Sequence, residues 1–238
     1  MHRASIDFSP RLGGMFHHRP LATVATALAA LLLGTVALSG CASASSQLSV
    51  GATVPAGKHP VVAIVGDSIE SGMGLEPFEA WPALVAVDRR WGLENFSEPG
   101  AGFVAIGASN TDFNGQIDQA IAAKANVVLI GASDNDLGQD TATVAKAMSA
   151  AVERLSDALP KAHLVGYNAL TGEASDSDLA PLNDALKQAV TAAGGTWIDL
   201  GQPYRGQLGL VQDDGEHPTL EGQQAIASVV LSRLDGIV

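Results

Sequence analysis

The chain has 238 residues, of which 47% are hydrophobic and 5% aromatic, and its formal net charge is −12. A folded part of about 200 residues suits one domain, and the acidic balance without a basic patch excludes nucleic acid as an expected partner. The only cysteine is Cys41, so a disulfide framework and a cysteine-rich zinc site are excluded as well.

Residues 1–41 have the layout of a secretory signal and are not expected to belong to the fold. An uncharged apolar run at residues 21–37 follows scattered arginines and precedes small residues. The run is shorter than the roughly 20 residues that a membrane-spanning helix needs. A start at Met15 would make the signal more compact than a start at Met1, and both remain open.

The apolar run is followed by Leu38-Ser39-Gly40-Cys41, which resembles the bacterial lipobox. The resemblance implies that Cys41 is lipidated, becomes the mature N-terminus and anchors the protein on the extracytoplasmic face of the cell membrane. An ordinary cleavage site with an incidental cysteine and an anchor that is never cleaved are the alternatives. Residues 42–59, rich in Ala, Ser and Gly, are then a flexible tether to a domain at residues 60–238.

Five short segments of this domain are expected to be strands. Residues 61–65 form a continuous apolar run, which is typical of a strand buried on both faces of a parallel sheet. The other four segments lie at residues 93–97, 126–131, 163–168 and 196–200.

Helical patterns separate and follow these strands, at residues 78–91, 113–124, 139–159 and 178–193 and after Pro218. Apolar residues along one face support the third of them, which Pro160 ends. Gly194 is the expected C-terminal cap of the fourth, and Thr219 the expected N-cap of the last. Strands alternating with helices predict an α/β domain, here a three-layer α/β/α sandwich around a mostly parallel five-stranded sheet.

Ligands of such folds bind at the carboxyl ends of the strands. Ser68 follows the first expected strand, Gly100 the second and Asn135 the third. A serine nucleophile needs a base to take its proton, and the base needs a partner to fix its tautomer. Asp214 and His217 are three residues apart before the last helix, so one turn of chain could join carboxylate and imidazole and aim the ring at Ser68.

Four short blocks resemble the SGNH hydrolases of the GDSL esterase/lipase superfamily, in the family's order. They are Gly-Asp-Ser-Ile-Glu-Ser-Gly at residues 66–72, Asn-Phe-Ser-Glu-Pro-Gly at 95–100, Ser-Asp-Asn-Asp at 133–136 and Asp-Gly-Glu-His-Pro at 214–218. The resemblance covers about residues 60–238 and implies a flavodoxin-like fold. It also implies that Ser68 is the nucleophile and that Asp214 and His217 complete a catalytic triad.

The same resemblance implies an oxyanion hole made of the backbone N–H groups of Ser68 and Gly100 and the side-chain amide of Asn135. One well-placed donor of this kind is worth about 2.7–4 kcal/mol. The chain departs from the family pattern at Ser133, where the family has glycine. A positive φ at this position would strain the serine and displace Asn135.

Other polar residues have simpler explanations. A Gly-Asp-Ser sequence after a strand is often only a turn, and Asp67 is expected to be structural. Asp134 and Asp136 are either metal ligands or, as we favour, residues that order the loop presenting Asn135. His59 and His163 precede expected strands, away from the strand ends that build the site. The glycines from residue 100 onward lack the Gly-x-Gly-x-x-Gly spacing, so no dinucleotide site is expected.

These observations favour a monomeric serine esterase that needs no cofactor and no metal and that cleaves a carboxylic ester through an acyl-serine intermediate. Short acyl groups on a glycan or on a small soluble alcohol are the expected substrates, because no inserted lid and no aromatic stripe is evident. Two alternatives are an acyltransferase that uses the same triad and a non-catalytic lipoprotein that binds a glycan or lipid.

Overall fold

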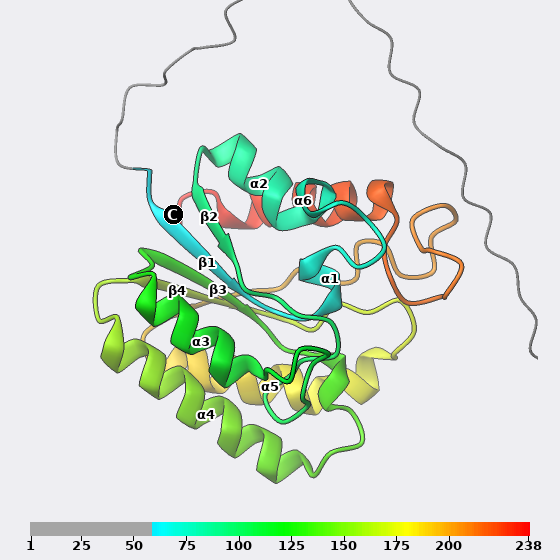
Figure 1. Cartoon of the computed structure of the whole chain (residues 1–238). Helices are drawn as coiled ribbons and strands as arrows, with labels where there is room; N and C mark the ends of the chain where they lie inside the picture. Colours follow the sequence, from blue (N-terminus) through cyan, green and yellow to red (C-terminus); the bar gives the residue numbers. More distant parts are fainter. Residues whose placement is uncertain (1–58) are drawn as a thin grey trace, which may run out of the picture. The chain divides into compact units, whose positions relative to one another are not determined.

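The computed structural model describes residues 59–238, so the expected signal, Cys41 and the tether up to residue 58 lie outside the described residues. Five strands alternate with helices in this part (Figure 1). The strands are β1 (Val61–Val65), β2 (Gly92–Asn95), β3 (Val127–Gly131), β4 (His163–Tyr167) and β5 (Thr196–Ile198). The α-helices are α1 (Ser68–Ser71), α2 (Trp81–Arg89), α3 (Phe113–Ala122), α4 (Thr141–Ala158), α5 (Asp176–Ala192) and α6 (Leu220–Leu234), with 3₁₀ turns η1 (Pro77–Glu79) and η2 (Asp134–Asp136).

All the neighbouring strands pair in parallel, in the order β2-β1-β3-β4-β5. This order is that of flavodoxin-like sheets, and it confirms the fold class expected from the sequence. The chain leaves β1 toward β2 on one side and returns to β3 on the other. The crevice at the carboxyl ends of β1 and β3 is therefore the switch point where such folds bind ligands, and Ser68 directly follows β1.

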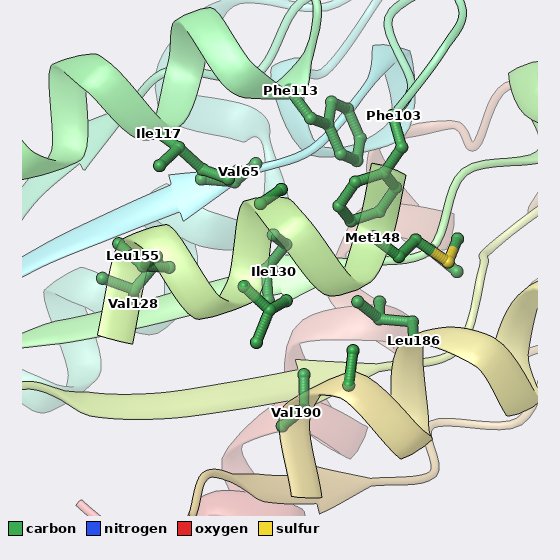
Figure 2. Packing of buried hydrophobic residues seen from close by; sticks show 14 of the residues in the cluster. Val65, Phe103, Phe113, Ile117, Val128, Ile130, Met148, Leu155, Leu186 and Val190 are labelled. Atoms are coloured by element: carbon green, nitrogen blue, oxygen red, sulfur yellow. The ribbon is translucent and has the colours of Figure 1, made fainter. Parts of the chain in front are cut away.

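Helices cover both faces of the sheet, α2 and α6 on one and α3, α4 and α5 on the other (Figure 1). Alternate residues of each strand point to opposite faces, so Ala63 and Val65 join one core while Val62 and Ile64 join the other. Figure 2 shows apolar side chains gathered around Val128 and Ile130 of β3 in the first of these cores. The short apolar runs of the sequence are thus strands buried on both faces, as expected.

The helix boundaries follow local capping chemistry. Asp140 caps the N-terminus of α4, Ser175 that of α5 and Thr219 that of α6, each by accepting a backbone N–H from the first turn. Gly194 follows α5 with a φ of 77°, so the expected caps at Thr219 and Gly194 are confirmed. No helix within residues 59–238 has the length and apolar character needed to span a membrane.

Two local expectations were inaccurate. The helix expected at residues 78–91 is divided, because η1 takes its first turn and α2 begins only at Trp81, with a proline in its first turn. The four-residue helix α1 was not expected, since residues 68–71 are too few to show a helical period. It starts at Ser68, where Asp67 and Glu70 form a capping box.

Candidate active site

The structure brings Ser68, His217 and Asp214 into one chain of hydrogen bonds. The Ser68 Oγ lies 2.9 Å from His217 Nε2, and His217 Nδ1 lies 2.7 Å from Asp214 Oδ2. The serine stands at the end of β1 and the other two residues lie in the loop before α6. This is the arrangement in which a serine can pass its proton to an imidazole held by a carboxylate.

Asp214 is oriented by its own loop. Its Oδ1 accepts the backbone N–H groups of Glu216 and His217, both at 3.0 Å, while Oδ2 faces the imidazole. The hydrogen bonds from the backbone and the ring of His217 lower the pKa of Asp214 to about 2. The carboxylate is therefore ionised across the neutral range and holds Nδ1 as the protonated ring nitrogen.

Polar side chains fix the histidine loop to the elements around the serine. Gln223 on α6 is fully buried; its amide donates to the Ile69 carbonyl (2.9 Å) and its oxygen accepts the Trp81 backbone N–H (2.8 Å). Gln212 donates to the carbonyls of Met73 and Pro218, both at 2.9 Å. These contacts join α6 and its preceding loop to α1 and α2, and so set the distance between base and nucleophile.

The three expected oxyanion-hole residues lie around the same strand ends. Gly100 has a φ of 80°, a left-handed conformation that favours glycine. Within residues 59–238 the backbone N–H groups of Ser68 and Gly100 form no hydrogen bond, which leaves them open to a bound oxygen. Asn135 lies in η2, where its Nδ2 is 3.2 Å from the Ala101 carbonyl oxygen and thus beside the Gly100 turn.

Ser133 is accommodated without backbone strain. Its φ of −122° and ψ of 135° are ordinary extended values, so the positive φ considered from the sequence does not occur. The side chain is fully buried, and its hydroxyl donates to Asp67 Oδ2 at 2.6 Å. The same oxygen accepts the Asn135 backbone N–H at 3.2 Å, so the residue that replaces glycine is part of the site's framework.

Asp136 orders the loop after Gly100, as favoured from the sequence for this residue and Asp134. Its buried carboxylate accepts three successive backbone N–H groups, those of Phe103 (2.7 Å), Val104 (2.9 Å) and Ala105 (2.9 Å). Phe103 in turn packs edge-on against Phe113 of α3, with ring centroids 4.9 Å apart. No cluster of three or more His, Cys, Asp or Glu residues within the described range is arranged to hold a metal ion.

Asp134 instead takes part in a carboxylate group beside the triad that sequence reasoning missed. Its neighbour Glu216 accepts hydrogen bonds from the Thr171 hydroxyl (3.0 Å) and from the backbone N–H groups of Gly172 (3.0 Å) and Glu173 (3.1 Å). Burial, followed by the charges of Asp67 and Glu216, raises the pKa of Asp134 to about 7. No local sequence signal marks these partners, because Thr171 is 45 residues from Glu216.

A second missed feature is the buried carboxyl pair Asp67 and Glu70, on either side of the nucleophile in sequence. Glu70 accepts the Asp67 backbone N–H (3.0 Å), and Asp67 accepts that of Ile69 (3.0 Å). Burial raises the pKa of both carboxyls, that of Asp67 also through the neighbouring Glu70 charge. Asp67 therefore has the structural role expected of it, as a cap of α1 and an acceptor for Ser133. By contrast, His163 begins β4, at the edge of the sheet opposite the site.

An open cleft of about 670 Å³ adjoins the triad. Asp134 and Glu216 line it, and each is the chain neighbour of a site residue, Asn135 and His217 respectively. The other lining residues are Leu137, Gly138, Gln139, Thr141, Thr171, Glu173, Ala174 and Asp178. The walls are mostly polar and carry four carboxyl groups.

Comparisons with known proteins agree with this geometry. The model of the GDSL-like Lipase/Acylhydrolase family matches residues 64–225, more than half of the chain. A search of curated proteins finds no match to the chain.

Among solved structures, a G-D-S-L family protein from Desulfitobacterium hafniense is similar over 74% of this chain and 100% of its own, with a TM-score of 0.63 and 15% identity. A psychrotrophic esterase from Pseudoalteromonas sp. is similar over 74% of this chain and 97% of its own, with a TM-score of 0.59 and 17% identity. A family two carbohydrate esterase from Clostridium thermocellum is similar over 74% of this chain and 63% of its own (TM-score 0.61, 14% identity). At these identities the likeness shows a shared fold.

Proposed function

Because this chain belongs to the GDSL-like lipase/acylhydrolase family, and is thus a hydrolase, we propose that it is a serine esterase with Ser68 as nucleophile. The single observation that carries this proposal is the continuous hydrogen-bond chain from Ser68 Oγ through His217 to Asp214, with distances of 2.9 and 2.7 Å. In the resting state the ionised Asp214 keeps the proton on His217 Nδ1, so Nε2 is free to accept the serine proton.

The reaction then proceeds in two halves. Ser68 Oγ attacks the ester carbonyl carbon while its proton passes to His217 Nε2, and a tetrahedral oxyanion forms. The imidazolium returns the proton to the departing alkoxide oxygen, which leaves as the alcohol, and an acyl-serine remains. A water molecule, deprotonated by the same ring, attacks this second ester and releases the carboxylic acid and the free serine.

The oxyanion in both halves needs donors that are already in place. The open N–H groups of Ser68 and Gly100 supply two, and the side-chain amide of Asn135 supplies a third. Removal of one such donor costs about 10²–10³-fold in kcat in well-studied hydrolases. This places the attacked carbonyl at the carboxyl ends of β1 and β3.

The cleft supports a polar alcohol part in the substrate. Its carboxyl-bearing walls suit hydroxyl-rich groups, since carboxylates accept hydrogen bonds from sugar hydroxyls and disfavour long acyl chains. Carbohydrate esterases are among the structurally similar proteins. The proposed substrate is therefore a short acyl group, such as acetyl, on a glycan or other small polyol.

The test is a Ser68→Ala variant assayed against acetyl, butyryl and octanoyl esters and labelled with a fluorophosphonate. We expect the wild type to be labelled on Ser68 and to prefer the acetyl ester, and the variant to lose labelling and turnover. Ser156→Ala, a half-buried serine of α4, is the matched control and should keep both. Turnover above a few per cent in Ser68→Ala would reject the nucleophile, and transfer of acyl groups to an added alcohol in preference to water would make the protein a transferase.

We also propose that the domain is anchored to the extracytoplasmic face of the membrane through a lipid on Cys41. The support is the sequence alone, an apolar signal core followed by Leu38-Ser39-Gly40-Cys41 and a polar tether. A tether of this length reaches on the order of 20–25 Å as a flexible chain, which leaves the cleft accessible to soluble or wall-bound esters.

A further inference from the structure

We infer that Ser133 is a positioning residue that holds the Asn135 amide with one N–H engaged and the other directed to the oxyanion. The inference deepens the proposed function and rests on it. It starts from the buried hydroxyl of Ser133, which is fully enclosed and lies between the nucleophile's capping residue and the third donor of the oxyanion hole.

The hydrogen-bonding capacity of this hydroxyl is fully used. A serine hydroxyl has one hydrogen and two lone pairs. The hydrogen goes to Asp67 Oδ2 at 2.6 Å, the shortest contact of the group. The lone pairs accept the backbone N–H of Asn135 at 3.2 Å and its side-chain Nδ2–H at 3.0 Å. Ser133 thus grips both the backbone and the side chain of Asn135 and is itself held by a carboxyl group.

The three distances around Asn135 Nδ2 decide how many of its hydrogens are free. Nδ2 lies 3.0 Å from Ser133 Oγ and 3.2 Å from the Ala101 carbonyl oxygen, and these two oxygens are 3.0 Å apart. The triangle is nearly equilateral, so the two acceptors subtend about 60° at the nitrogen. The two N–H bonds of a planar amide diverge by about 120°. Both acceptors therefore share one N–H, and the other is left for the substrate.

The direction of the grip also matters for rate. An amide free to rotate would have to be ordered each time the oxyanion forms, whereas donors already in place need no reorganisation at that moment. Without the Ser133 hydroxyl, Asn135 keeps only the Ala101 carbonyl as a side-chain partner, and the backbone N–H of Asn135 loses its acceptor. The effect should fall on the transition state, hence on kcat, and not on substrate binding.

The test is a double-mutant cycle of Ser133→Ala and Asn135→Ala, with kcat and KM measured for the preferred short-chain ester. We expect Asn135→Ala to lower kcat by about 10²–10³-fold, and Ser133→Ala to lower it at least about tenfold with KM within about twofold. In the Asn135→Ala background, Ser133→Ala should change kcat less than about twofold, because its effect acts through Asn135. Ser133→Cys, which keeps a side chain of similar size but only a weak donor and acceptor, should resemble Ser133→Ala.

Thermal unfolding of each variant separates positioning from folding. The inference holds if Ser133→Ala melts cooperatively and stays folded at the assay temperature while kcat falls. Equal losses of kcat in both backgrounds, a rise of KM at constant kcat, or an Asn135→Ala variant with full kcat would each overturn it. None of these results touches the proposed function, which fails only if Ser68→Ala remains active or unlabelled wild type turns over ester.

Discussion

Asp134 shows how one carboxyl group near the cleft couples folding to pH. Burial, with the charges of Asp67 and Glu216, raises its pKa from 3.8 to about 7. The folded protein therefore binds this proton more tightly than the unfolded chain does between these two values. The contribution to stability is fully present below about pH 4 and is lost as the pH rises through 7.

We predict that Asp134→Asn raises the melting temperature at pH 8 by several degrees relative to wild type and has little effect at pH 4. The amide keeps the size of the side chain but cannot become an anion beside Glu216. Melting curves at pH 4, 6 and 8 measure the difference. Asp157→Asn, at an exposed position of α4, should give a difference that does not change with pH. An Asp134→Asn effect equally constant across the range would contradict the prediction.

Asp214 leads to the opposite pH behaviour. Hydrogen bonds from His217 lower its pKa to about 2, so its stabilising contribution is present above its ordinary pKa and is lost only as the pH falls through about 2. We predict a single acid limb in kcat/KM above pH 4, due to His217, because Asp214 remains ionised there. Asp214→Asn should lower kcat by about 10²–10⁴-fold with little change in KM, since the imidazole loses its orientation. A second ionisation between pH 4 and 5 in the wild-type profile would count against this account.

At the scale of the elements, α3 fixes the end of β1 just before the nucleophile. The buried side chain of Gln116 accepts the Gly66 backbone N–H and donates to the Gly66 carbonyl, both at 2.9 Å. Any shift of this peptide would move Ser68, two residues on. One side chain thus satisfies both backbone groups where the strand ends.

We predict that Gln116→Ala lowers the free energy of unfolding by about 2–4 kcal/mol, because two buried backbone groups lose their partner. Gln119→Ala on the exposed side of the same helix is the control and should cost about 0.5 kcal/mol or less. Urea unfolding of both variants measures the difference. Should the two variants prove equally stable, the Gly66 clamp would have no energetic importance.

The strands were predictable because each is a short apolar run buried on both faces. Residues 61–65 were predicted without error, and the other strands differ by one or two residues at their ends. The residues that approach one another at the strand ends, Ser68 and His217 among them, were also placed by topology and motif. Glu70, Glu216 and the role of Ser133 could not be predicted, because their partners are buried neighbours or backbone groups brought close only by the fold. The clamp by Gln116 bridges 50 residues, which no local pattern records.

At the scale of the whole molecule, the proposed lipid anchor and the hydrolase domain are separate units of the sequence. We predict that the mature protein begins at Cys41, carries a diacylglyceryl group and partitions with membranes, since two acyl chains give stable anchoring. Cys41→Ala should release or misprocess the protein without changing kcat/KM of the purified domain. Ser45→Ala in the tether is the control and should leave the partition unchanged. Mass spectrometry of the mature N-terminus is decisive: an unmodified terminus at another residue would rule out the lipoprotein form.

The separation of nucleophile and base along the chain has a consequence for a protein that is exported. Ser68 and His217 are 149 residues apart, and the base reaches the serine only when the loop before α6 is in place. A chain crossing a membrane from its N-terminus exposes the serine first and the histidine almost last. During transit the serine has no base and no carboxylate relay, so the emerging polypeptide is inert toward esters. The enzyme is thus its own latent precursor, switched on by the docking of its final helix without any proteolytic step.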